Sequence, residues 1–311
     1  MTGSEPPDAA LIGQMLALAS AASFAFSNVF ISHTRRSGGD KGVLFSVLVT
    51  MAMSFLLFLA LEARQTGLVP LRTEGAPMGM LMFAGAGVMA MVFGRTLVFE
   101  SIRRLGVTRS SAVKRLNPFF SVILAAILLS EPVTGGDLAG MAAIALAFAI
   151  LIRESVRLRG TLRVEAPPPA AYLFGVVGAL AYALSYIGRK AGLDALPAPA
   201  FGTFVSAVTG FAVFSALALI SSRYRILFRG VFRDLDRWIV MAAIMVSLGQ
   251  VLLFAALAFE TVTTVVMIAS MEIFLSMFLS IIIFRTERAP GPIILIAAAM
   301  ATAGVLLVAA N

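Results

Sequence analysis

The sequence predicts an all-α integral membrane protein with ten transmembrane helices, arranged as two inverted five-helix repeats around a central cavity. Composition, ten apolar windows and the alternation of loop charges support this class. Of 311 residues, 60% are hydrophobic and 13% are charged, about half the charged share of a soluble domain. A chain this apolar cannot cover itself with polar surface, which excludes a soluble enzyme and a nucleic-acid binder. Because there is no cysteine, disulfides and thiolate metal sites are also excluded.

Ten apolar windows are long enough, or nearly so, for a bilayer core about 30 Å thick, which needs roughly 20 helical residues. The windows are 11–32, 42–61, 78–99, 110–130, 138–152, 170–188, 200–220, 238–259, 263–284 and 292–310. The chain therefore divides into a tail (1–10), a first repeat (11–152), a cytoplasmic linker (153–169) and a second repeat (170–311). The first window lacks a preceding basic region, so we expect it to be retained.

The two halves share weak but ordered similarity. FGRTLVFES at 93–101 aligns with LGQVLLFAA at 248–256, an offset of 155 residues. The same offset pairs Asn117 with Glu272. Matches in the same order and at the same spacing indicate an internal duplication, and an odd number of helices in each copy requires the second copy to insert upside down.

Loop charges test this inversion independently. In the first half, the first and third loops hold six basic residues, and the second and fourth hold two. In the second half, the first and third loops hold two basic residues, and the second and fourth loops hold seven. Adding the four Arg of the linker, the positive-inside rule places the basic side in the cytoplasm of a bacterium and both termini outside its inner membrane. Inverted repeats with a site at their interface are typical of transporters.

The segment SSAVKRLNPFFSVILAAILLSEP (110–132), followed by GGDLAG (135–140), resembles the fourth and fifth helices of the EamA branch of the drug/metabolite transporter superfamily. The resemblance extends loosely over the chain and is strongest to bacterial exporters of aromatic and other neutral amino acids. It implies that helices one, three, four, six, eight and nine surround the central cavity. The second half departs from the pattern, since Glu272 stands in place of Asn117 and no proline matches Pro118.

Four ionisable residues fall inside the predicted spans, where each is a functional candidate because its burial in lipid is costly. Glu272 lies deepest, and it would bind a substrate ammonium or carry a coupling proton; the alternative is a structural pair with a cation of the fourth helix. Lys114 lies beside the hinge expected at Pro118, where it would bind a carboxylate or else extend to the interface. Arg115 points about 100° away from Lys114, and Arg95 is expected to extend to the cytoplasmic interface.

A polar and aromatic face follows from helical spacing. Three residues of the sixth span, Tyr182, Ser185 and Tyr186, occupy positions i, i+3 and i+4 and therefore share one side of the helix. Phe24 and Asn28 occupy the matching places on the first span. Packing between helices is the alternative role for such residues. The candidate substrate-binding residues are Lys114, Asn117, Tyr182, Ser185, Tyr186, Phe24, Asn28, Ser247 and Gln250.

These residues predict a secondary transporter that exports small amphipathic metabolites, such as aromatic or other neutral amino acids, by alternating access. Either uniport or proton antiport fits, and the alternative is a multidrug or organic-cation exporter of the same fold. The sequence has one His and no Cys, and its spans contain no cluster of carboxylates. It therefore lacks the side chains that an enzyme active site would need. The expected partners are the small-molecule substrate, membrane lipid and, for antiport, protons; neither nucleic acid, cofactor nor metal is expected, and a monomer is compatible with the sequence.

Overall fold

The computed structural model describes residues 7–33, 39–63, 74–97, 100–101, 104, 113–158, 169–233, 235–280 and 292–310. Within them every regular element is a helix, as predicted. The predictions for parts of the loops and of the linker fall outside the described residues: Arg35, Arg36, Arg64, Arg72, Arg103, Arg109, Arg285, Arg288 and 159–168.

The helices follow one another in a regular up-and-down order along the chain. They are α1 (Pro7–Ser32), α2 (Gly39–Leu57), η1 (Phe58–Glu62), α4 (Ala76–Gly87), η3 (Val88–Gly94), α6 (Asn117–Leu128), α7 (Gly135–Leu158), α8 (Pro169–Ala195), α9 (Pro199–Ile220), α10 (Ser222–Gly230), α11 (Arg237–Phe259), α12 (Val262–Ala269), α13 (Glu272–Phe278) and α14 (Pro292–Ala309). The segments η1 and η3 are π-helical continuations of α2 and α4. Such widened turns occur often at functional sites.

The helices are those of a membrane-embedded protein. Among the described residues, six helices are long and apolar enough to cross a membrane: Ala9–Ile31, Gly42–Glu62, Ala76–Leu97, Ala170–Ala195, Pro199–Ile220 and Arg237–Phe259. Four further apolar helices are shorter: Asn117–Leu128, Gly135–Ile150, Val262–Phe278 and Leu295–Ala309. Large apolar side chains point outward from them, including Ile127 at 69% exposure and Ile220 at 82%. Lipid contact explains this outward apolar surface, which would be unfavourable in water.

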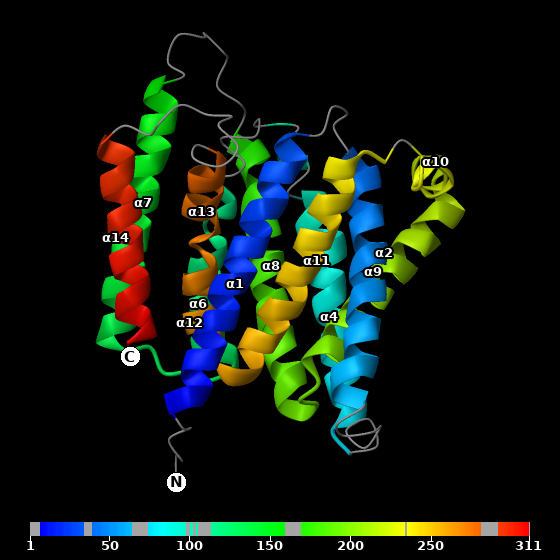
Figure 1. The fold of residues 1–311 in the computed structure, drawn as a ribbon, viewed down its shortest axis with the longest axis horizontal. Helices are drawn as coiled ribbons and strands as arrows, with labels where there is room; N and C mark the ends of the chain where they lie inside the picture. The colour runs from blue at the N-terminus through cyan, green and yellow to red at the C-terminus, as the bar shows by residue number, and fades with distance from the viewer. Residues whose placement is uncertain are drawn as a thin grey trace.

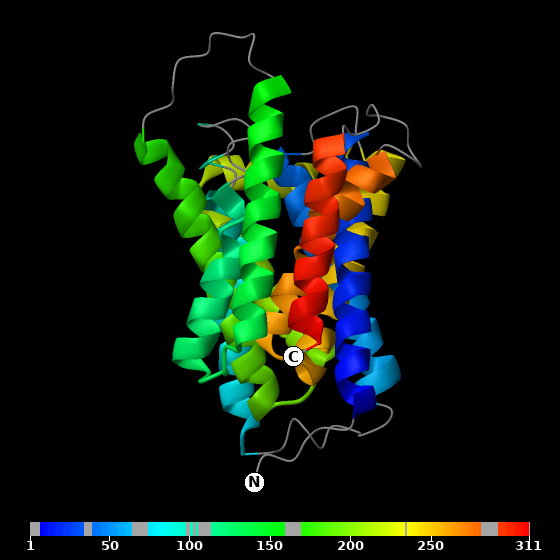
Figure 2. The same cartoon turned by 90° about the vertical axis from the view of Figure 1, so that its left-hand side faces the viewer.

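The helices lie roughly parallel in one bundle (Figure 1). The most extensive contact joins α1 to α11, the first half of the chain to the second, and α2 and α4 both pack on α9. The start of α1 and the end of α14 lie at the same end of the bundle, where the Gln14 side chain donates to the Ala309 carbonyl at 2.9 Å. The helices α7 and α14 form a separate pair at one side, which Figure 2 shows from the front.

Two glycines allow α7 and α14 to approach closely. A Cβ added at Gly140 would lie 2.5 Å from the carbonyl oxygen of Gly304, and one added at Gly304 would lie 2.7 Å from the carbonyl oxygen of Gly140. No side chain fits between the two backbones, so both positions require glycine. Close backbone packing of this kind stabilises helix pairs in membranes, where lipid provides no hydrophobic drive for helices to associate.

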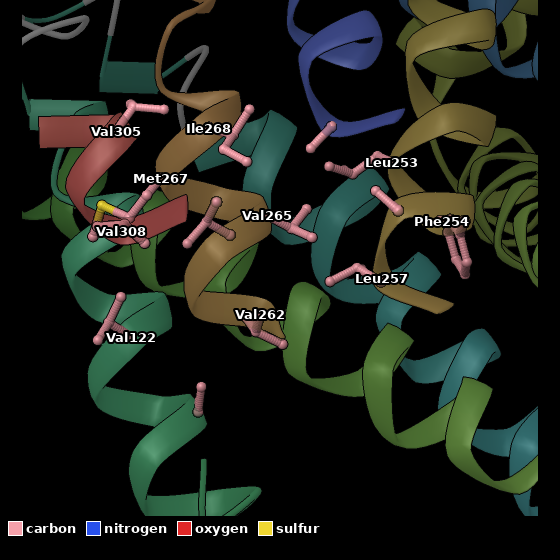
Figure 3. Packing of buried hydrophobic residues seen from close by; sticks show 14 of the residues in the cluster. Val122, Leu253, Phe254, Leu257, Val262, Val265, Met267, Ile268, Val305 and Val308 are labelled. Atoms are coloured by element: carbon pink, nitrogen blue, oxygen red, sulfur yellow. The ribbon is translucent and has the colours of Figure 1, made fainter. Parts of the chain in front are cut away.

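The main core lies between α6, α11, α12 and α14. Figure 3 shows Val265 and Ile268 of α12 between Val308 of α14 and Leu253 of α11. The helix α12 is nearly all buried, in contrast to the half-exposed helices around it. It is therefore held on every side by protein and forms a fixed support for α13, which follows it.

Two apolar spans are interrupted by a turn. The helix α6 begins at Asn117 after a turn, with Pro118 as its second residue, and α13 begins at Glu272 after a turn at 270–271. In each turn the N–H of the last residue, Leu116 or Met271, donates to the carbonyl three residues back at 3.0 Å. The two interruptions lie 155 residues apart and have the same local hydrogen bonding. A tight turn inside a span leaves backbone polar groups available for a ligand.

Three expected boundaries differ from the structure. The sixth span was predicted to end at 188, but α8 continues to Ala195, so Arg189 and Lys190 lie in a helix and not in a loop. Hydropathy ended the window there because it counts charge and ignores what a charge packs against. The helix α7 continues through 153–158, expected as linker. The segment 222–230, expected as loop, forms α10, a short helix with arginines and aromatic residues on different sides, suited to the membrane surface.

Candidate functional site

Glu272 stands at the first position of α13, beside the interruption between α12 and α13. The Asn28 amide of α1 donates to its Oε1 atom at 2.7 Å and makes a longer contact with the Ser276 hydroxyl at 3.4 Å. Asn28 is exposed and Glu272 is partly buried. The carboxylate is therefore held in place from one side and is accessible from the other.

Lys114 precedes the interruption before α6 and is also exposed. Its ammonium lies 5.7 Å from the centre of the Tyr182 ring and within electrostatic range of Glu272. No carboxylate lies within the 4 Å of an ion pair with Lys114 among the described residues. An ammonium and a carboxylate thus lie within electrostatic range of each other without forming an ion pair.

Tyr182 and Tyr186 of α8 lie near these charges. The Asn117 side chain lies within hydrogen-bonding reach of the Tyr186 hydroxyl. Tyr182 packs against Gly94 of η3, where an added Cβ would lie 3.0 Å from its Cζ atom. We call the following set the polar centre: Asn28, Lys114, Asn117, Tyr182, Tyr186 and Glu272. Its members come from α1, α6 with the turn before it, α8 and α13.

The Arg95 side chain points in a different direction from the one predicted. Its guanidinium donates to the Ser46 hydroxyl at 3.2 Å and to the Val43 carbonyl at 3.5 Å, and it lies within hydrogen-bonding reach of Tyr182. It therefore points into the bundle and not to the interface, because neighbouring helices supply acceptors for it. Arg95 positions Tyr182 at the edge of the polar centre.

Ser247, Phe24 and Arg115 lie outside the polar centre. Ser247 is 0% exposed, and its hydroxyl is occupied by Thr50 at 2.8 Å and the Ala243 carbonyl at 2.7 Å. The hydrogen bond between Ser247 and Thr50 joins α11 to α2. Phe24 packs flat against Gly249, so it contributes helix packing. Arg115 faces away from Lys114, with its guanidinium 5.1 Å from the centre of the Phe148 ring on α7.

Ser185 and Gln250 occupy the boundary between α8 and α11. Ser185 is 1% exposed. Its hydroxyl, and the Oε1 atom of Gln250, are buried without a hydrogen-bond partner in the part of the chain that the structure describes. Both residues were predicted as binding candidates, and the structure brings them to neighbouring helices.

Sequence reasoning missed Arg189, because the predicted sixth span ended one residue before it. Its side chain is 2% exposed and lies between the rings of Tyr186 and Phe254, with guanidinium-to-centroid distances of 5.6 and 4.7 Å. Helical spacing offered a signal, since Arg189 lies i+4 from Ser185 and continues the same polar face.

Two glutamates that were not predicted as functional cap helices. The Glu131 carboxylate accepts from the N–H groups of Val262 and Thr263 at 2.9 and 3.3 Å, at the start of α12. Glu62 accepts from the N–H of Ala200 at 2.6 Å, at the start of α9. A carboxylate at a helix N-terminus satisfies free N–H groups and favours the helix dipole. Each cap joins the first half of the chain to the second.

His33 and Trp238 lie together at the opposite end of the bundle from Gln14. The centres of the His33 and Trp238 rings lie 4.9 Å apart, and the Arg237 guanidinium lies 4.8 Å from the centre of the Trp238 ring.

No group of three or more His, Cys, Asp or Glu side chains able to hold a metal occurs in the described ranges.

The fold and the polar centre define a multi-pass helical membrane protein with opposite charges at interrupted helices, an arrangement suited to binding a small polar solute. Residues 11–153, just under half of the chain, match the EamA-like transporter family. That family consists of membrane transporters of small solutes and not enzymes, in agreement with the prediction that this chain is not an enzyme.

One solved structure, titled "Crystal structure of protein", matches with a TM-score of 0.71 over 97% of this chain and 96% of its own, at 15% identity. At this identity the likeness establishes the fold. No curated protein matches the chain.

Proposed function

We propose that the protein is a secondary transporter that exports small amphipathic metabolites, with aromatic or other neutral amino acids as the leading cargo class. The observation that carries this proposal is the pair of Glu272 and Lys114. They are accessible, within electrostatic range, and not closed into an ion pair. A zwitterion placed between them would present its ammonium to Glu272 and its carboxylate to Lys114. The rings of Tyr182 and Tyr186 would line its apolar side chain.

Alternating access would come from two inverted five-helix copies. Support comes from the equal turns before Asn117 and Glu272, 155 residues apart with the same backbone hydrogen bond. The family match also ends at 153, next to the boundary expected for the first copy. Rocking of the two copies would expose the polar centre to each side in turn, with Pro118 as a hinge.

Orientation follows from the basic loops, which would place the end of the bundle with Trp238 in the cytoplasm of a bacterium and both termini outside. The correction to α8 strengthens this arrangement. With Arg189 and Lys190 in a helix, only Arg64 and Arg72 remain as basic residues of the expected outer loops. A C-terminal fusion to a reporter that is active only in the periplasm should be active, and activity of a cytoplasm-only reporter would contradict this topology.

Counterflow of radiolabelled phenylalanine into proteoliposomes, with and without a pH gradient, tests the function. Saturable uptake supports a carrier, and linear flux without saturation contradicts it. For proton antiport, Glu272 is the carboxylate of the polar centre, faced by Asn28, Lys114 and Arg115. Glu272→Gln should abolish the response to the gradient, and an unchanged response would remove Glu272 from coupling.

Organic cations remain the second cargo class, because a carboxylate in the membrane suits them. The position of Lys114 within electrostatic range of Glu272 opposes a cation through repulsion. Competition for phenylalanine counterflow decides between the classes: unlabelled tyrosine should compete and the lipophilic cation tetraphenylphosphonium should not.

A further inference from the structure

Arg189 is a buried cation that nothing in the described part of the chain neutralises. No carboxylate lies within 4 Å of its guanidinium, which makes no hydrogen bond to any described residue, and its Nε atom is fully enclosed. Contacts with two rings partly replace water. They leave the buried Nε donor without an acceptor among the described residues, an arrangement that is costly unless a ligand supplies one.

Two polar residues one turn before Arg189 and Phe254, Ser185 and Gln250, also have a polar atom without a partner among the described residues. The Lys190 ammonium donates to the Leu257 carbonyl at 3.1 Å, and Arg189 lies over Phe254, which sets the register of α8 against α11. One turn back on each helix are Ser185 and Gln250. These helices run in the same direction (Figure 1), so Ser185 and Gln250 lie at the same level. Each carries a buried polar atom without a partner.

We infer that Ser185, Arg189 and Gln250 form a buried subsite at the boundary between α8 and α11, which receives the cargo carboxylate in a second conformation, after Lys114 has bound it in the first. It lies about 10 Å along α8 from Tyr182, from seven residues at 1.5 Å each, and so beyond Tyr186 from Lys114. The inference rests on the proposed transport function, because Ser185 and Arg189 are 1% and 2% exposed and a cargo reaches them only after the helices around them move.

A carboxylate fits this subsite better than other anions. The flat guanidinium fork of Arg189 matches two carboxylate oxygens, the Ser185 hydroxyl donates a third hydrogen bond, and the Gln250 amide donates after rotation by 180°. Arg189 is the one cation among the three subsite residues. Lys190 is engaged by Leu257 and by Asp194 at 3.7 Å, and Arg95, which is within electrostatic range of Arg189, donates to Ser46. One charge balances a carboxylate and leaves a phosphate dianion with an unbalanced negative charge.

Binding to the purified protein tests the inference without requiring transport. The probes are phenylacetate, which has a ring and a carboxylate, and phenethylamine, which has a ring and an amine. Sodium chloride and inorganic phosphate serve as other anions. Thermal unfolding at increasing probe concentration gives apparent dissociation constants. Phenylacetate should stabilise the wild type more than equal chloride or phosphate does.

Arg189→Gln should weaken phenylacetate binding by about ten-fold to a hundred-fold, as expected for loss of a hydrogen-bonded charge, and leave phenethylamine within about two-fold. Arg189→Lys should fall between, because it keeps charge and loses the fork. The matched control Lys190→Gln removes a neighbouring cation and should change phenylacetate binding by less than about two-fold.

The inference is overturned if phenylacetate stabilises no better than chloride or phosphate, or if Arg189→Gln weakens both aromatic probes equally. Where Arg189→Gln yields no folded protein, Ser185→Ala and Gln250→Leu decide: each should weaken phenylacetate by about three-fold or more and spare phenethylamine, and no change in either would overturn the subsite. Absence of phenylalanine counterflow in a protein that binds phenylacetate would reject the proposed function and leave the carboxylate subsite intact.

Discussion

Replacing Asn28 with alanine removes the hydrogen bond that ties α1 to the carboxylate of Glu272. The bond is short, at 2.7 Å, and its acceptor is charged, and buried bonds of this kind contribute about 1.5–3 kcal/mol. Because Asn28 is exposed, water replaces part of that contribution. We therefore expect a loss of about 1 kcal/mol, which corresponds to about five-fold weaker cargo binding.

Phenylalanine counterflow measures this effect as an increase in the half-saturating concentration. Ser276→Ala is the matched control, since its hydroxyl is the second and longer contact of Asn28 at 3.4 Å, and it should change affinity by less than two-fold. Thermal unfolding should be nearly unaffected by Asn28→Ala, because the side chain is solvated. Unchanged affinity, or a large loss of thermal stability with unchanged affinity, would refute the role assigned to this hydrogen bond.

Three further predictions concern helix packing, helix capping and the two adjacent cations. Gly140→Val should destabilise the α7–α14 pair by about 1–3 kcal/mol through overpacking, as measured by thermal unfolding, whereas Gly135→Ala, with open space at its Cβ, should not. Glu131→Gln should cost about 1 kcal/mol by weakening the cap of α12, and an unchanged unfolding temperature would deny the cap a stabilising role. Lys114→Gln should reduce phenylalanine counterflow at least ten-fold and Arg115→Gln much less; equal losses would show that both serve one site or neither does.

The polar centre could be predicted in part. Internal similarity paired Asn117 with Glu272, and both residues begin a helix after a turn. Helical spacing grouped Tyr182 with Tyr186, and both lie near Lys114. These predictions rested on local periodicity and on offset, which a sequence carries directly.

Other parts could not be predicted, because they depend on what a side chain meets on another helix. Ser247 has the composition of a binding residue, yet Thr50 of α2 takes its hydroxyl. Arg95 has the depth of an interface residue, yet Ser46 and Tyr182 offer it acceptors inside the bundle. Arg189 was assigned to a loop because charge lowers hydropathy, whereas two rings hold it inside α8.

The sequence by itself determined that the chain is helical and embedded in a membrane, because a stretch of about 20 apolar residues in lipid must satisfy its backbone hydrogen bonds within one helix. It also determined which spans carry costly charges. Only the tertiary structure decided which of those charges face one another, since that depends on contacts such as Asn28 with Glu272, 244 residues apart. Among the described residues, the same packing left the buried Arg189 without an acceptor, because the helices around it contribute rings and no carboxylate.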